Sequence, residues 1–288
     1  MKTTINNNLK RVDDLINTSF ITCSCCNLPM PSWIELSIID FCNRKCVFCP
    51  KSNDLVAPNQ SHLYMDINLV KKLINDLYDI KFCGNIVLAG YGEPMFSPIY
   101  LQIIEEISKH FRIELVTNGD LLNIKNIKQL ITLGTYINVS VYDKDRLIEI
   151  QNLFRTVDIP EDRYILRDRW YSETDDFGIK LTNRAGLVNI GNQTKIDKTA
   201  KCFYPFYSIT IDWNGDVLLC PQDWNRRIKF GNIAYNSVHD IWIGSSYNKY
   251  RELLYSGNRN ILPCKLCNCD GIHHGILYAN NFIRNKND

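Results

Sequence analysis

The chain has 288 residues, 45% of them hydrophobic, which is enough for one large domain plus a small one. Its 33 basic and 31 acidic residues give a formal net charge of +2, so there is no electrostatic case for nonspecific nucleic-acid binding. We find no export signal and no apolar run of membrane length, and therefore expect a cytoplasmic protein that contacts no membrane. The 12 cysteines are then not those of a short secreted disulfide protein.

Strand-like and helix-like runs alternate along the first two thirds of the chain. Strands are predicted at 33–39, 85–89, 112–117, 136–142 and 164–169. Between them, residues 66–80 have apolar side chains at helical spacing behind the N-cap candidate Asp66, and a second helix follows Pro98. Repeating βα units predict a parallel sheet whose functional loops gather at one rim. Five or six units before about residue 190 are too few for an eight-fold barrel.

Three cysteines, Cys42, Cys46 and Cys49, follow the first predicted strand with three and then two residues between them. A four-iron cluster has four corners, so three thiolates leave one iron open to an exogenous ligand. The spacing differs from the paired cysteines of tetrahedral zinc sites. Three unrelated buried thiols are the alternative, but cysteine is abundant and clustered in this chain. The loop therefore predicts a reactive iron–sulfur site at the carboxyl end of a strand.

After residue 190 the pattern changes. Residues 207–211 and 216–219 flank Asn214-Gly215, a strong hairpin signal, and a helix is predicted at 238–255 behind Ser237. Four cysteines bracket this region: Cys202, Cys220, Cys264 and Cys267. Such a set binds zinc or closes a 4Fe–4S cluster, and spacing alone does not decide between them.

The three-cysteine loop, with Phe48 directly before its last cysteine, resembles that of the radical S-adenosylmethionine (radical SAM) enzymes. The run Gly90-Tyr91-Gly92-Glu93-Pro94 resembles the family's motif for the SAM amine, although Gly-x-Gly alone is more typical of a turn. The resemblance implies an α/β fold with a partial (β/α)6 barrel at 33–190, after an extension at 1–32. It also implies that SAM chelates the open iron and is cleaved to a 5′-deoxyadenosyl radical that abstracts a substrate hydrogen.

The same resemblance implies further cofactor contacts at the strand ends. Thr117 and Asn118 close the third predicted strand and Ser140 lies near the end of the fourth, positions from which family members reach the SAM carboxylate and ribose. With Phe48, Gly90, Gly92 and Glu93, these residues form the predicted SAM site. Without the resemblance, Thr117-Asn118-Gly119 would be interpreted as a turn, and Ser140 as a strand residue without a specific role.

Residues 191–288 resemble a twitch domain followed by a tail. The twitch domain is a small α+β domain related to the SPASM domain, and it holds one auxiliary 4Fe–4S cluster. The implied cofactors are two 4Fe–4S clusters and SAM, the second cluster being held by Cys202, Cys220, Cys264 and Cys267. Four protein ligands leave no open iron, which favours a role in electron transfer.

Twitch-bearing relatives include cyclitol dehydrogenases, so the resemblance predicts oxidation of a secondary alcohol of a sugar or cyclitol in specialised metabolism. The implied partners are a small-molecule substrate and a reducing donor such as flavodoxin or ferredoxin. One alternative is an epimerase of a sugar or peptide carbon, which returns hydrogen from a cysteine. A second alternative is a peptide maturase, but the segment before the first predicted strand is short for such an enzyme. A third is a non-catalytic zinc or iron–sulfur module.

Several polar and thiol side chains have less specific surroundings. Arg167 and Arg169 lie on the fifth predicted strand, where a cation could hold a carboxylate, phosphate or alkoxide of the substrate. Cys269 is a substitute ligand, a hydrogen donor or an inert thiol, and we favour the last. Cys23, Cys25 and Cys26 have no fourth partner nearby in the sequence. We expect solvent-side thiols, and the alternatives are a cap on the open bottom of the barrel or a metal site. Cys83 is predicted to lie in the core.

Overall fold

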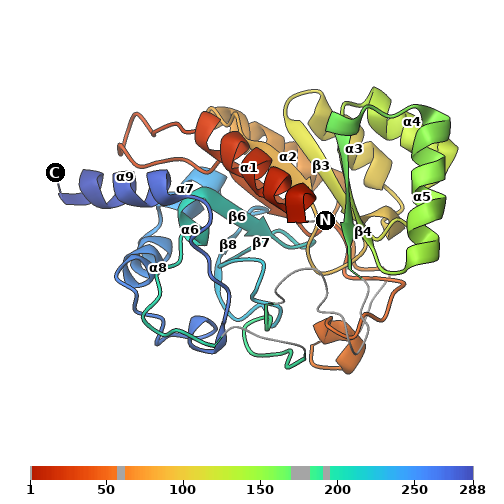
Figure 1. The fold of residues 1–288 in the computed structure, drawn as a ribbon. Helices are drawn as coiled ribbons and strands as arrows, with labels where there is room; N and C mark the ends of the chain where they lie inside the picture. The colour runs from red at the N-terminus through yellow and green to blue at the C-terminus, as the bar shows by residue number, and fades with distance from the viewer. Residues whose placement is uncertain (1, 57–61, 170–181, 191–194, 288) are drawn as a thin grey trace.

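A computed structural model of the protein describes residues 2–56, 62–169, 182–190 and 195–287. Its centre is one eight-stranded sheet with the order β5-β4-β3-β2-β1-β6-β7-β8 (Figure 1). Six strands pair in parallel: β1 (Trp33–Leu36), β2 (Asn85–Leu88), β3 (Arg112–Thr117), β4 (Tyr136–Val141), β5 (Tyr164–Asp168) and β6 (Ser208–Ile211). The last two are antiparallel: β7 (Asp216–Leu218) and β8 (Lys229–Asn232). The predicted α/β class is confirmed.

The sixth parallel strand comes from an unexpected place. β1 to β5 follow one another in chain order, but β6 pairs with β1 on its other side, with Trp33 opposite Ser208 and Leu36 opposite Ile211. The sheet therefore continues without a break into the C-terminal part of the chain. The proposed domain boundary near residue 190 stays a prediction, and it divides one sheet.

Four helices follow the strands and cover the outer face of the sheet: α2 (Ile67–Asp79), α3 (Tyr100–Ser108), α4 (Ile124–Thr132) and α5 (Lys144–Val157). The predicted N-cap is confirmed, because the Asp66 side chain accepts a hydrogen bond from the Asn68 amide. Strand side chains alternate between the two faces. On β1, Ile34 and Leu36 are fully buried against the helices, whereas Glu35 faces inward. The inner face thus has room for polar groups.

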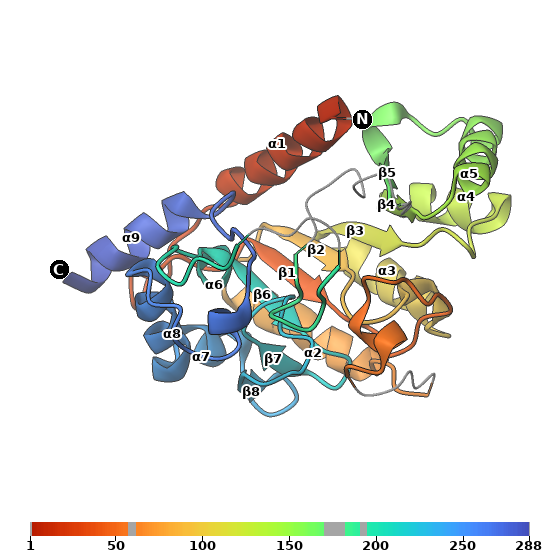
Figure 2. The same ribbon diagram turned by 60° about the horizontal axis from the view of Figure 1, so that its bottom comes forward.

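The N-terminal helix α1 (Lys2–Thr18) spans from α9 (Ile276–Asn287) to β5 across the inner face (Figure 2). Arg11 donates a 2.8 Å hydrogen bond to the buried carboxylate of Glu114 on β3, and its guanidinium lies 3.8 Å from the centre of the Tyr136 ring. Ile16 packs with Tyr278 of α9 in a separate apolar cluster. The first helix and the last helix are therefore held together near one side of the sheet.

The C-terminal region contains the predicted hairpin, β6 and β7, with Gly215 at a φ of +87° in its turn. The helices here are α6 (Tyr204–Tyr207), α7 (Val238–Ile243) and α8 (Ser245–Tyr255). The prediction of one helix at 238–255 is wrong in one respect: Gly244 has ψ near 145°, which ends α7 before α8 begins. The predicted cap Ser237 does begin α7, where its side chain accepts from the Asp240 amide.

Four short 3-10 helices complete the described elements: η1 (Pro50–Asn53), η2 (Pro94–Phe96), η3 (Glu161–Arg163) and η4 (Cys264–Leu266). Across the described ranges, no helix is both long and apolar enough to cross a membrane. The prediction that Cys83 lies in the core is wrong, because it sits in the turn between α2 and β2 and its side chain is exposed.

Candidate functional site

The residues predicted to bind SAM and substrate lie around one cavity of about 480 Å³. Most of them come from the carboxyl ends of the strands β1 to β5, and Cys269 joins them from the C-terminal region. The three cysteines of the first loop form one wall. All ten of the predicted SAM and substrate residues line the cavity: Phe48, Gly90, Gly92, Glu93, Thr117, Asn118, Ser140, Arg167, Arg169 and Cys269. Because parallel strands end at the same edge of a sheet, loops that are far apart in sequence meet here. Their individual roles stay predictions.

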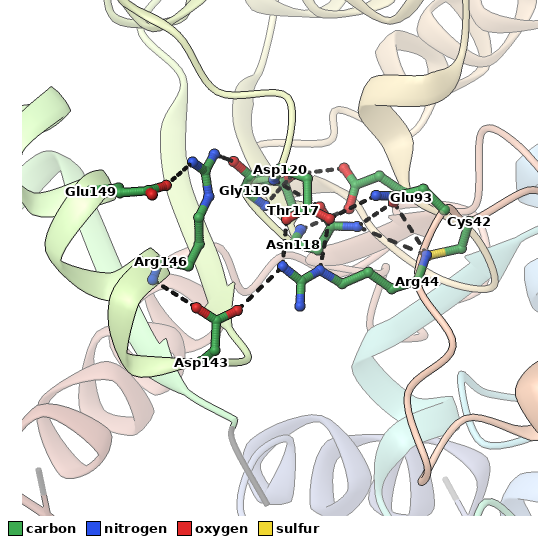
Figure 3. A network of polar contacts seen from close by, with 11 residues as sticks. Cys42, Arg44, Glu93, Thr117, Asn118, Gly119, Asp120, Asp143, Arg146 and Glu149 are labelled. Carbon is green, nitrogen blue, oxygen red and sulfur yellow. Dashed lines mark hydrogen bonds and ion pairs between the residues drawn. The ribbon is translucent and has the colours of Figure 1, made fainter.

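The cysteine loop is shaped by a polar network that ties it to the end of β3 (Figure 3). Arg44, between the first two cysteines, donates from Nε and Nη2 to the two carboxylate oxygens of Asp120, at 2.7 and 2.5 Å. Asn118 Nδ2 donates to Asn43 Oδ1 at 2.7 Å and lies 3.9 Å from Cys42 Sγ. A bidentate arginine–carboxylate pair fixes geometry as well as charge. Contacts between protein side chains therefore hold this loop against the strand ends without help from a cofactor.

Glu93 and Thr117, both predicted SAM contacts, are bonded to each other. The Glu93 carboxylate accepts from Thr117 Oγ1 and the Asn118 amide at 2.7 Å and from the Met95 amide at 3.2 Å. Burial raises the pKa of Glu93 to about 7, although these hydrogen bonds oppose the shift. The bonds join the glycine motif to the end of β3, so both side chains support the cavity wall.

Glycine in this motif serves close backbone packing. A Cβ added to Gly92 would lie 2.3 Å from the Ile39 carbonyl oxygen, so only glycine lets the motif pack against the chain that leaves β1. The Glu93 amide also donates to the Phe41 carbonyl at 2.7 Å. The glycine motif is therefore pinned beside the cysteine loop, which brings two predicted cofactor motifs together.

Arg167 and Ser140 line the cavity from neighbouring strands. Arg167 Nη2 donates to Ser140 Oγ at 2.9 Å, while Arg167 Nε is buried with no hydrogen-bond partner among the described residues. Burial lowers the pKa of Arg167, and the carboxylate of Glu114 opposes the shift. A buried, unsatisfied guanidinium N–H is costly, which indicates a polar group that binds there.

Sequence reasoning missed Glu35, which lines the same cavity from the middle of β1. Burial raises the pKa of this carboxyl to about 7, while the charges of Arg184 and Arg167 lower it and Glu114 raises it. A titratable group with a shifted pKa in a cavity is a candidate for acid–base chemistry. The available signal was a single carboxylate in an otherwise apolar strand, at the position that faces inward.

The second cysteine set lines an adjoining apolar cavity. Five thiols border it, namely the predicted four and Cys269, and Cys269 also borders the larger cavity. The buried Arg259 donates to the carbonyls of Ala200, Lys201 and Cys269, each at 2.8 Å, and to that of Asp270 at 3.1 Å. This guanidinium thus joins the segment before Cys202 to the segment after Cys267.

The donor set of this second cavity fits an iron–sulfur group. Burial raises the pKa of Cys202 to about 11 and that of Cys264 to about 12, and Arg259 opposes both shifts. Buried thiols of this kind become thiolates when a metal binds them, and the arginine supplies further positive charge. A Cβ added to Gly271 would lie 2.4 Å from Cys202 Sγ, so glycine leaves room for that sulfur.

A buried charge network links the two sites. Asp40, two residues before the first cysteine loop, accepts from Lys51 Nζ at 2.5 Å and from Arg226 Nη2 at 2.8 Å. Arg226 also donates through Nε to Asp212 in the C-terminal hairpin, and it lies 4.6 Å from the centre of the Tyr91 ring. Two acids and two bases balance in charge here. The network therefore fixes the C-terminal hairpin against the first cysteine loop and the glycine motif.

Comparisons with known proteins agree with this arrangement. The family model of the radical SAM superfamily matches residues 36–163, and that of the SPASM iron–sulfur cluster-binding domain matches residues 202–270. The S-adenosyl-L-methionine-dependent 2-deoxy-scyllo-inosamine dehydrogenase of Niallia circulans is 27% identical over 242 residues, which are 82% of this chain and 92% of that protein.

Two solved structures share the fold. BtrN in complex with AdoMet and 2-DOIA has a TM-score of 0.72 and 24% identity, covering 87% of this chain and 98% of that one. The structure of anSMEcpe with bound AdoMet has a TM-score of 0.55 and 14% identity, covering 90% and 92%. SAM, a radical SAM 4Fe–4S cluster and an auxiliary iron–sulfur domain accordingly belong to this protein. The chain is a member of the radical SAM superfamily, with a SPASM-type C-terminal domain.

Proposed function

We propose that this protein is a radical SAM dehydrogenase that oxidises a secondary alcohol of a cyclitol or sugar to a ketone. The observation that carries the proposal is one polar cavity bordered by a set of three cysteines and by Cys269 of the neighbouring set. The dehydrogenase activity of the Niallia circulans relative supports it.

Oxidation of a secondary alcohol removes a hydrogen atom, a proton and an electron. When bound, SAM and the two iron–sulfur groups supply a radical that takes the hydrogen atom and an acceptor that takes the electron. The residues for the first group are Cys42, Cys46 and Cys49, and those for the second are the four cysteines from Cys202 to Cys267. A reducing donor such as flavodoxin or ferredoxin provides the electron that starts the reaction.

The protein's own side chains handle the proton. Glu35 lines the cavity and, once ionised, accepts the proton of the substrate hydroxyl. Arg167 Nε, which is buried without a hydrogen-bond partner among the described residues, donates to the same oxygen and stabilises its developing negative charge. Arg169 lines the cavity beside them. The two carboxylates, of Glu35 and Glu93, and several guanidinium groups suit a small ring with hydroxyl or amino substituents.

An epimerase is the second candidate, because Cys269 borders the cavity and an epimerase needs a thiol that returns hydrogen to the substrate carbon. The two reactions differ in solvent labelling. In deuterium oxide the thiol carries deuterium, so an epimerised product gains one deuterium at the reacting carbon, whereas a ketone gains none there.

The test is anaerobic turnover of candidate cyclitols and aminocyclitols in deuterium oxide, with excess reductant, followed by mass spectrometry. We expect a ketone in equal amount to 5′-deoxyadenosine, and unchanged turnover in Cys269→Ala. The joint Ala variant of Cys42, Cys46 and Cys49 is the control and should cleave no SAM. A deuterated, non-oxidised product whose label disappears in Cys269→Ala would replace the dehydrogenase with the epimerase.

A further inference from the structure

A third group of cysteines lies away from both cavities, in the segment between α1 and β1. Its backbone folds into a tight turn: Thr22 and Pro29 form an antiparallel bridge, and the Asn27 amide donates to the Cys23 carbonyl at 2.9 Å. Asn27 has a φ of +56°, which reverses the chain. The turn carries Cys23, Cys25 and Cys26 within four residues, and so gathers three sulfurs on one short segment.

The structure brings a fourth ligand to this turn. His239 of α7 lies with Nε2 at 3.4 Å from Cys23 Sγ and at 3.5 Å from Cys25 Sγ. The sulfurs of Cys23 and Cys25 are 2.8 Å apart, and all four ligand atoms, including that of Cys26, lie within 4.8 Å of one another. The expectation that no fourth partner lies nearby is therefore wrong, although the thiol of Cys25 is exposed and those of Cys23 and Cys26 are partly exposed, as expected for solvent-side thiols. The partner lies more than two hundred residues further along the chain, beyond the reach of a spacing argument.

We infer that Cys23, Cys25, Cys26 and His239 form a closed, structural zinc site. Zinc bonds of about 2.3 Å to sulfur and about 2.0–2.1 Å to nitrogen place tetrahedral ligand atoms roughly 3.5–3.8 Å apart. The separations of His239 Nε2 from the two sulfurs, 3.4 and 3.5 Å, are close to this range, whereas the sulfurs of Cys23 and Cys25 must move apart from 2.8 Å to share one ion. Three thiolates and an imidazole are soft ligands, which favour zinc over magnesium or calcium. Four protein ligands leave no open position, so the site stabilises the fold and takes no part in turnover.

The histidine is already oriented for this task. Nε2 is the nitrogen that faces the thiols, and the other ring nitrogen, Nδ1, lies 3.6 Å from the Asp240 carboxylate. A carboxylate behind the second nitrogen is the usual companion of a zinc-bound histidine. Helix α7 is itself anchored, because the Val238 amide donates to the buried Asp76 of α2 at 2.9 Å. The protein frame thus presents His239 to the turn.

Zinc at this position would join two distant parts of the chain. The turn precedes β1, and α7 belongs to the C-terminal region that matches the SPASM family model. One direct bond already connects them, from Trp242 Nε1 to the Pro29 carbonyl at 2.8 Å. The metal would add a further, stronger link, and removal of zinc should loosen α7 from the turn.

The test is metal analysis of the full-length, anaerobically reconstituted protein. We expect about one zinc per chain in addition to the cluster iron, and less than about a tenth of that zinc in His239→Ala and in Cys26→Ser, with iron unchanged. Cys83→Ser, which removes an exposed thiol outside the group, is the matched control and should retain zinc. The joint Ala variant of Cys42, Cys46 and Cys49 should show the reverse pattern, with iron reduced and zinc kept.

A second measurement covers the case in which a ligand variant does not fold. Cobalt replacement of zinc in the unmodified protein should give the visible absorption of a tetrahedral site with thiolate ligands, and added zinc should abolish it. Absence of zinc and of the cobalt signal would overturn the inference. So would zinc that persists in both His239→Ala and Cys26→Ser, a different metal at these residues, or a disulfide between Cys23 and Cys25 found by mass spectrometry.

Discussion

Glu35 offers a sharp test of the proposed chemistry, because burial raises the pKa of its carboxyl from 4.5 to about 7. A carboxyl with a raised pKa is neutral below that pH and ionised above it. Only the ionised form accepts a proton from the substrate hydroxyl. About one tenth of the molecules would carry an ionised Glu35 at about pH 6 and nine tenths at about pH 8. The rate of ketone formation, divided by the rate of SAM cleavage measured without substrate, should therefore rise about tenfold between about pH 6 and about pH 8.

The substitution Glu35→Gln keeps the size of the side chain and removes the titration. We expect it to lower ketone formation by about 10²–10⁴-fold, the usual contribution of a general base, and to abolish the rise with pH. The matched control is Glu114→Gln. Glu114 is a buried glutamate of the neighbouring strand β3, and its carboxylate is already held by Arg11 and Asn138, at 2.8 and 2.7 Å. That variant should keep a rise with pH, displaced to lower pH, because the charge of Glu114 helps to raise the pKa of Glu35.

The assay follows ketone and 5′-deoxyadenosine in the same anaerobic samples at each pH, with excess reductant. Formation of 5′-deoxyadenosine without substrate reports the SAM site alone, so it corrects for any effect of pH on reduction of the cluster. A tenfold rise that persists in Glu35→Gln would refute the assignment of Glu35 as the base. A flat profile in the unmodified protein would do the same.

Two further predictions concern arginines that hold the sites together. Arg259→Leu should reduce bound iron from about eight to about four per chain, because its four carbonyl contacts frame the second cysteine set, while the exposed Lys265→Leu should have no effect. Arg226→Leu should lower the free energy of unfolding by about 3–5 kcal/mol, because it leaves two buried aspartates with one lysine. The exposed neighbour Arg227→Leu should change it by less than about 0.5 kcal/mol, and equal effects of the two would contradict the network.

The features that the sequence predicted well depend on local signals. The hairpin between β6 and β7 follows from Asn214-Gly215, whose positive φ at glycine suits a tight turn. The start of α2 follows from one capping aspartate and apolar spacing. The first cysteine loop is identified from three thiols in a short run, and its role as a cluster site stays a prediction. In each case, the residues that interact are close in sequence, so a short segment is enough to predict the local structure.

The features that it missed depend on long-range packing. Nothing in residues 208–211 indicates that β6 pairs with β1, because a parallel partner is chosen by the whole sheet. Glu35 occurs alone in an apolar strand, and its altered pKa arises from burial and from charges on other segments. His239 meets its cysteines through the packing of α7 against α2. These three gaps have one cause, the absence of tertiary distances from a single sequence.

The position of β1 explains why two metal-binding regions can cooperate in one chain. The first cysteine loop follows its carboxyl end, β2 with the glycine motif lies on one side, and β6 lies on the other. The strand β6 pairs with β1 and begins the hairpin whose second strand, β7, ends two residues before Cys220. The second cysteine set is therefore attached to the same sheet as the first. A sheet resists sliding, because a shift of register would turn buried side chains to the wrong face. The two cysteine sets therefore keep a fixed separation, with Cys269 bordering both cavities, and the proposed dehydrogenase requires such a geometry to remove a second electron from its substrate.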